Sequence, residues 1–137
     1  MFIYLCGAIQ GCTDLECKDW IEQATRLLKP HICYNPMSRD YRGSEWNFSK
    51  KIVEEDKKDI DKSDLLLVKY ISPSVGTSME ILYAYNTFKP VFLVTDQSFE
   101  NLSPWLIYHI TFRYSSLEQA ILAIKEWGIN NEQTTKT

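Results

Sequence analysis

The stretch LLLVKYISPSVGTSMEILYAYNTFKPVFLV, residues 65–94, decides the fold. It opens with an apolar run, LLLVKY, which has the length and composition of a strand buried on both faces. A helix is expected from GTSMEI to about Phe88, where Lys89 and Pro90 end it, and VFLVT at 91–95 is expected to form the next strand. A strand, a helix and a second strand in this order predict a right-handed crossover between parallel strands.

The same alternation continues on both sides of this unit. Apolar runs at 2–6, 31–34 and 109–112 predict three more strands. Apolar residues at helical spacing predict helices over 14–29, 48–62 and 116–127, and the Pro- and Gly-containing segment 35–46 is typical of a loop. The pattern indicates an α/β, single-domain, doubly wound five-stranded parallel sheet with helices on both faces, over residues 1–128. Residues 129–137 are expected to form a polar, mobile tail.

Size and charge limit the classes of function. The 137 residues, 45% hydrophobic and 24% charged, suit one domain with a core. The net charge of -3 disfavours a protein held to nucleic acid by phosphate contacts. The chain begins at MFIYL without the segments of a secretion signal, and no apolar run is long enough to cross a bilayer. We therefore expect a cytoplasmic protein with small-molecule partners and no membrane partner.

The cysteines give no metal signal. Cys6, Cys12, Cys17 and Cys33 lack the CxxC spacing of zinc sites, and the chain has only two histidines to complete such a site. Separate reduced thiols and no metal site are therefore expected.

The topology predicts where a ligand binds. In doubly wound sheets the ligand lies at the carboxyl ends of the strands, near the point where the strand order reverses. Three loops meet this condition, at 7–12, 35–46 and 72–80. Gly7 and Gly11 permit a sharp turn and close approach of the backbone to a ligand, although GAIQG matches neither GxGxxG nor a P-loop.

Two carboxylates stand out by position. Asp56 lies four residues from both Ile52 and Ile60, on the apolar stripe of its helix. A carboxylate there is either at the rim of the core or functional, with a partner or a raised pKa. Glu80 follows Thr77 at the spacing of a capping box, so it is either part of a helix cap or a nucleophile.

Other positions have structural explanations beside functional ones. Tyr4 fits the core of the first strand, and Ser74 suits either a helix cap or a phosphate contact. Ser103-Pro104-Trp105 is typical of a helix start. Residue patterns alone leave these alternatives open.

Five segments connect these positions. The chain contains, in this order, IYLCGAIQG, NPMSRDYRG, IVEEDKKDIDKSDLLL, GTSMEILYAYNTFKPV and SPW. In order and spacing these segments resemble the nucleoside 2-deoxyribosyltransferase family over residues 2–112. The resemblance implies a flavodoxin-like sheet. It also implies that Glu80 is the catalytic nucleophile, that Asp56 handles a proton at the nucleobase, and that Tyr4 orients Glu80.

The resemblance further implies substrate contacts from the three loops and from a later segment, namely Gly7, Ile9, Gly11, Asp40, Arg42, Ser74, Gly76, Met79, Asn101 and Ser103. Asn101 and Ser103 are expected to reach a neighbouring subunit's site, which implies a homo-oligomer. Asp40 stands where transferases have a base-contacting Gln, and an acid there would favour bases that donate hydrogen bonds. Ser74 stands where transferases often have an acid.

The sequence therefore leaves three functions. The first is a transferase of nucleotide salvage that exchanges nucleobases through a covalent deoxyribosyl-Glu80 intermediate, with no metal or cofactor because the carboxylate performs the displacement. The second is a 2'-deoxynucleoside 5'-monophosphate N-glycosidase, a related hydrolase. Its PSxGxxxE segment matches PSVGTSME at 73–80, where Ser74 is the serine of the motif. The arginine and paired glycines of its first loop are missing here. The third is a non-catalytic nucleotide-binding module, which would leave Asp56 and Glu80 unexplained.

Overall fold

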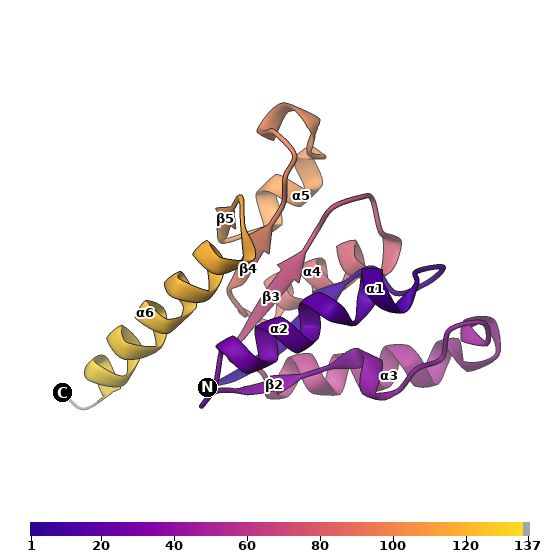
Figure 1. Ribbon diagram of the computed structural model, residues 1–137, viewed down its shortest axis with the longest axis horizontal. Helices are drawn as coiled ribbons and strands as arrows, with labels where there is room; N and C mark the ends of the chain where they lie inside the picture. The colour runs from indigo at the N-terminus through magenta and orange to yellow at the C-terminus, as the bar shows by residue number, and fades with distance from the viewer. Residues whose placement is uncertain (136–137) are drawn as a thin grey trace.

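A five-stranded, all-parallel sheet forms the centre of the protein (Figure 1). The computed structural model describes residues 1–135. The strands are β1 (Phe2–Gly7), β2 (Ile32–Tyr34), β3 (Leu65–Lys69), β4 (Val91–Val94) and β5 (Phe112–Tyr114), in the order β2-β1-β3-β4-β5. This order reverses between β1 and β3, as in flavodoxin-like sheets, and confirms the predicted fold class.

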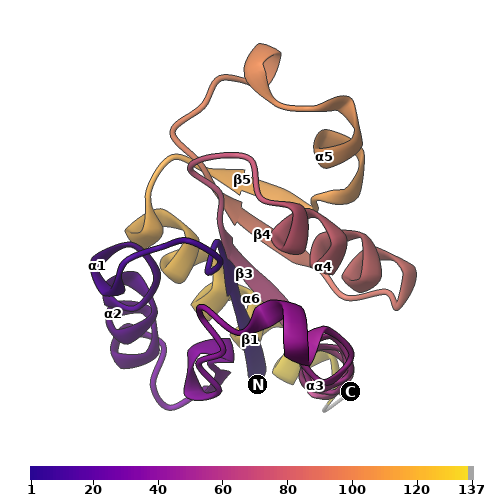
Figure 2. The same cartoon turned by 90° about the vertical axis from the view of Figure 1, so that its right-hand side faces the viewer.

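Helices cover both faces of the sheet (Figure 2). Helices α1 (Asp14–Cys17), α2 (Asp19–Leu27) and α6 (Leu117–Thr135) lie on one face, while α3 (Ser49–Lys62), α4 (Val75–Asn86) and α5 (Pro104–His109) lie on the other. Short 3-10 turns η1 (Pro36–Ser38), η2 (Glu45–Phe48) and η3 (Phe99–Asn101) lie in the connections. Each face has its own buried apolar cluster, so the sheet is covered as a doubly wound fold requires.

Successive side chains of β1 point to opposite faces of the sheet. Ile3 and Leu5 pack under α2 and α6, whereas Tyr4 and Cys6 point to the face that α3 and α4 cover. All four side chains are fully buried. A central strand therefore presents a hydroxyl and a thiol beneath two helices.

The structure corrects the predicted fifth strand. We expected a strand at 109–112, but His109 is the last residue of α5 and β5 begins at Phe112. Ser103 caps α5 by accepting from the Trp105 N–H, and Pro104 occupies its first turn. The helix that begins at this Ser-Pro pair thus continues to His109, the first residue of the apolar run HITF that we had expected to form a strand.

The first and last predicted helices also differ in extent. The segment 14–29 is divided at Lys18 into α1 and α2, and Thr13 forms a capping box with Glu16 at the start. Helix α6 continues to Thr135, past the boundary at 128 that we expected before a polar tail. The residues of α6 that pack on the core, among them Ala120, Ile124 and Trp127, end near Gly128, and the helix continues from there through polar sequence. Residues 136–137 of the expected tail lie outside the described residues.

The helices were also searched for a membrane span. Within residues 1–135, no helix combines the length and the apolar character that crossing a bilayer requires.

Candidate active site

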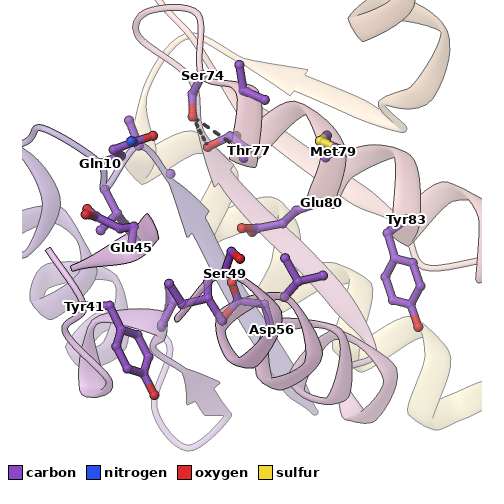
Figure 3. A pocket seen from close by; sticks show the side chains of 18 of the residues that line it. Gln10, Tyr41, Glu45, Ser49, Asp56, Ser74, Thr77, Met79, Glu80 and Tyr83 are labelled. Atoms are coloured by element: carbon purple, nitrogen blue, oxygen red, sulfur yellow. Dashed lines mark hydrogen bonds between the residues drawn. The ribbon is translucent and has the colours of Figure 1, made fainter. Parts of the chain in front are cut away.

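A cleft of about 800 Å³ opens at the carboxyl ends of β1 and β3, between α3 and α4. All three loops that the sequence analysis singled out contribute to it. Figure 3 shows side chains from these loops and from both helices around one space. The cleft therefore lies at the reversal of strand order, where doubly wound sheets bind ligands.

Glu80 projects from α4 into this cleft (Figure 3). Its Oε2 accepts a hydrogen bond from the Cys6 thiol, with 3.0 Å between the sulfur and the oxygen. Burial raises the pKa of Glu80 to about 7, and the charge of Asp56 adds to this rise, while hydrogen bonding from Cys6 opposes it. The carboxylate therefore titrates near neutral pH.

The structure corrects the predicted cap of α4. Thr77 does not form a capping box with Glu80, because the helix begins earlier, at Val75. Ser74 is the cap: its Oγ accepts from the Thr77 N–H at 3.3 Å and donates to Thr77 Oγ1 at 3.0 Å. Glu80 lies beyond the first turn, so its carboxylate is free of helix capping.

Asp56 projects into the same cleft from α3 (Figure 3). Burial raises its pKa to about 6, and the nearby Arg39 guanidinium opposes that rise. The sequence left two explanations for Asp56, a position at the rim of the core or a functional role. The structure favours the second, because Asp56 is partly buried and faces a cavity that also contains Glu80.

Tyr4 lies beneath both carboxylates. Its hydroxyl is completely buried and has no hydrogen-bond partner within the described residues. Burial, followed by the charges of Glu80 and Asp56, raises its pKa well above the usual value, so the phenol stays protonated. Tyr4 thus offers a donor between two acceptors without satisfying either at full hydrogen-bond geometry.

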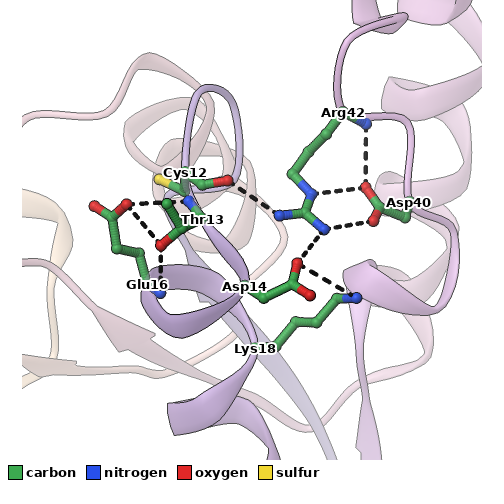
Figure 4. A network of polar contacts seen from close by, with 7 residues as sticks. All are labelled: Cys12, Thr13, Asp14, Glu16, Lys18, Asp40 and Arg42. Carbon is green, nitrogen blue, oxygen red and sulfur yellow. Dashed lines mark hydrogen bonds and ion pairs between the residues drawn. The ribbon is translucent and has the colours of Figure 1, made fainter.

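Asp40 has a different position from the one expected. It does not line the cleft; instead it holds Arg42, with Arg42 Nε–Asp40 Oδ1 at 2.9 Å and Arg42 Nη2–Asp40 Oδ2 at 2.7 Å (Figure 4). Arg42 also donates to the Cys12 carbonyl at 3.1 Å and pairs with Asp14. Arg42 therefore joins the loop after β2 to the loop after β1, and Asp40 holds its guanidinium in that position. The expected contact of Asp40 with a nucleobase stays a prediction.

The other predicted substrate contacts divide into two groups. Those that line the cleft are Gly7, Ile9, Arg42, Ser74, Gly76 and Met79. Gly11, Asn101 and Ser103 do not line it. The φ of +73° at Gly11 explains that glycine by backbone conformation, and Ser103 is engaged as the cap of α5.

Several residues in or beside the cleft were missed by the sequence analysis. Cys6 contacts Glu80, and Arg39 pairs with Asp56 at 3.6 Å. Gln10, Tyr41 and Glu45 also line the opening. Of these residues, the sequence could have indicated only Cys6. Residues two apart on a strand share a face, so Cys6 is expected on the same face as Tyr4, which was already a candidate. The described residues contain no group of three His, Cys, Asp or Glu side chains placed to hold a metal ion.

Strand order, cleft position and paired carboxylates together define an α/β protein of flavodoxin-like topology with a cleft that two carboxylates line. The chain belongs to the nucleoside 2-deoxyribosyltransferase family, whose model matches residues 3–134. This confirms the resemblance seen in the sequence. Members of this family are transferases or glycosidases that act on N-glycosidic bonds.

Two solved structures share the fold. A 2-deoxyribosyltransferase from Bacillus psychrosaccharolyticus aligns with a TM-score of 0.71 at 17% identity, covering 88% of this chain and 90% of the other. The CMP N-glycosidase BcmB of Clostridium botulinum aligns with a TM-score of 0.60 at 18% identity, covering 91% of this chain and 99% of the other. No curated protein sequence matched the chain. Similarity at this level of identity establishes the shared fold, and the reaction must be argued from the site.

Proposed function

We propose that the protein is a nucleoside 2'-deoxyribosyltransferase that uses Glu80 as its nucleophile. One observation carries the proposal: Glu80 and Asp56 project from facing helices into one cleft, and burial raises the pKa of both. Paired carboxylates with raised pKa values are expensive in a structural role and suit glycosyl transfer.

The reaction has two displacement steps. The ionised Glu80 attacks C1' of the deoxyribose, the C1'–N bond breaks, and its electron pair leaves with the nucleobase. The product of this step is a deoxyribosyl ester of Glu80 and a free base. A second nucleobase then attacks C1', which re-forms an N-glycosidic bond and releases the carboxylate.

Asp56 would supply the proton that the leaving base needs. It donates this proton as the C1'–N bond breaks and recovers one from the incoming base. In the ligand-free site burial raises the pKa of both carboxylates, and each charge disfavours the other, so the pair can hold one proton near neutral pH. A base that accepts a hydrogen bond from protonated Asp56 stabilises the acid form, so substrate binding would favour the proton on Asp56 and the ionised form of Glu80.

Hydrolysis of 2'-deoxynucleoside 5'-monophosphates is the second candidate. It is favoured by Ser74, which lines the cleft at the amino end of α4, where free N–H groups and the helix dipole attract anions. In this reaction water replaces the second base. The two candidates therefore share Glu80 and differ in the acceptor and in the 5' group.

One assay separates these functions. The protein is incubated with deoxyinosine and cytosine, and separately with each deoxynucleoside monophosphate, with Glu80→Ala as the control. Formation of deoxycytidine supports transfer, whereas free base from the monophosphates supports the hydrolase. Absence of turnover in all mixtures would favour the non-catalytic nucleotide-binding module, and full activity of Glu80→Ala would remove the proposed nucleophile.

The proposal includes a homo-oligomer acting in the cytoplasm on small-molecule nucleosides. Asn101 and Ser103 lie outside the cleft of their own chain, so their expected substrate contacts require a neighbouring subunit. Sedimentation of the purified protein would test this: a monomer would exclude any role of these residues in another subunit's site.

A further inference from the structure

Strand β1 presents two polar side chains to Glu80. Tyr4 and Cys6 share one face of the strand, and both are fully buried. The Cys6 thiol makes a hydrogen bond to Glu80 Oε2 at 3.0 Å, while the Tyr4 hydroxyl has no partner within the described residues. The two donors are therefore in different states, one engaged and one available.

We propose that Cys6 is a positioning residue for Glu80: its thiol fixes Oε2 and leaves Oε1 as the atom that attacks the sugar. This inference rests on the proposed role of Glu80 as the nucleophile. Cys6 lies under the helices and does not line the cleft, so it acts through Glu80 and not on the substrate.

The chemistry of the thiol suits this task. Burial, followed by the charge of Glu80, raises the pKa of Cys6 well above its usual value, so the group remains an S–H donor when Glu80 is ionised. A thiol is a weak donor compared with a hydroxyl. It can therefore hold the carboxylate in one orientation while withdrawing less charge from the attacking oxygen than a hydroxyl would.

The surroundings of Glu80 leave this role to Cys6. The titratable groups that face the carboxylate are Cys6 and Tyr4 from β1 and Asp56 from α3. Asp56 repels it when ionised, and the Tyr4 hydroxyl, which faces both Glu80 and Asp56, reaches neither carboxylate at full hydrogen-bond geometry. A buried hydroxyl without a partner is costly, so the free Tyr4 donor independently indicates a site built to receive another acceptor.

Three substitutions of Cys6 separate the donor from the volume it fills. Cys6→Ala removes both, Cys6→Val fills the space without a donor although it adds volume, and Cys6→Ser keeps a donor. Cys33→Ala is the matched control, because Cys33 lies in the neighbouring strand β2 and packs with the cluster on the opposite face. Thermal unfolding of each variant shows which of them retain the fold.

The first readout is steady-state transfer from deoxyinosine to cytosine. We expect the Ala and Val variants to lose about tenfold in kcat with KM changed less than about twofold, since the contact orients the nucleophile and does not bind substrate. Cys6→Ser should retain kcat within about threefold, and Cys33→Ala should match the unmodified protein. A folded Cys6→Val with unchanged kcat would overturn the proposal, as would a folded Cys6→Ser that loses as much as Cys6→Ala.

The second readout needs no turnover and so is independent of the proposed function. The protein is labelled at the glutamate side-chain carboxyl with ¹³C, and Glu80 is assigned with Glu80→Gln. We expect its titration midpoint to rise in the Ala and Val variants and to lie at or below the original value in Cys6→Ser. An unchanged midpoint in Cys6→Val would overturn the contact itself. A raised midpoint in a protein inactive on every substrate would support the contact and refute the proposed reaction.

Discussion

Arg39 lies 3.6 Å from Asp56, measured from Nη2 to Oδ1, while its shorter contacts go to other acids of the same helix. Its Nε lies 2.8 Å from Glu55 Oε2, and its Nη2 lies 2.7 Å from Asp59 Oδ2. These two contacts hold the guanidinium at the edge of the cleft, where it opposes the effect of burial on Asp56. A residue of the loop after β2 therefore influences the proposed proton donor on α3.

The first prediction concerns this influence. Replacing Arg39 by Gln should raise the pKa of Asp56 above its present value of about 6, because a positive charge that favours the carboxylate is lost. The measurement is a ¹³C titration of aspartate carboxyls, with Asp56→Asn used for assignment. Arg39→Lys keeps the charge and should show a smaller rise. Equal midpoints in the original protein and in Arg39→Gln would contradict this electrostatic role.

Glu80 should also destabilise the fold at neutral pH. Burial raises its pKa from 4.5 to about 7, so the folded protein binds more protons than the unfolded chain over this range. The free energy of unfolding must therefore fall as pH rises from about 4 to about 7. Glu80→Gln removes this loss and should raise the free energy of unfolding by about 3 kcal/mol at pH 8, but by little at pH 4.

Denaturant unfolding at the two pH values tests this difference. Glu54→Gln, on the exposed side of α3, is the control and should change stability by less than about 0.5 kcal/mol at either pH. A Glu80→Gln variant that is less stable than the original protein at pH 8 would show that the carboxylate contributes net stability.

The proton of Asp56 should matter only for bases that need one. Asp56→Asn is expected to slow base release from deoxyinosine by about 10²–10⁴-fold, the usual contribution of general acid catalysis. A 7-methylated purine deoxynucleoside carries a positive charge on its base, which leaves neutral without receiving a proton. For this substrate Asp56→Asn should slow base release by a factor at least about tenfold smaller than for deoxyinosine, as measured by single-turnover release of base. Equal losses on both substrates would assign Asp56 to binding instead.

Much of the fold was predictable because its signals are local. The apolar run of β1 ends at Gly7 and that of β4 follows Pro90, and the alternation of apolar runs with helices predicts a doubly wound arrangement. The prediction of a strand at 109–112 was wrong because a short apolar run suits either structure, and here the Ser103 cap with Pro104 extended α5 to His109. Polar composition likewise hid the continuation of α6 to Thr135.

The candidate site was predictable where a residue's own position carries information. Asp56 was found from the apolar stripe of its helix, and the family resemblance singled out Glu80. The contacts of Cys6 and Arg39 join residues from different elements, 74 residues apart in the case of Cys6 and Glu80, and no local pattern records them. The contact between Asp40 and Arg42 was not predicted either, because Arg42 also binds the first loop across the cleft opening, and the expected contact of Asp40 with a nucleobase stays a prediction.

The structural position of Asp40 leads to the last prediction. If Asp40 acts only by holding Arg42, Asp40→Ala should raise KM by about three- to tenfold for all nucleobases and leave kcat unchanged, because the two loops at the opening lose their connection. A base-reading role would instead change the preference between bases. The measurement is kcat and KM for several acceptor bases in a double-mutant cycle with Arg42→Gln. Asp40→Ala should have no further effect in the Arg42→Gln background, since the group through which it acts is already gone. A base-dependent loss that persists in that background would restore Asp40 as a contact to the nucleobase.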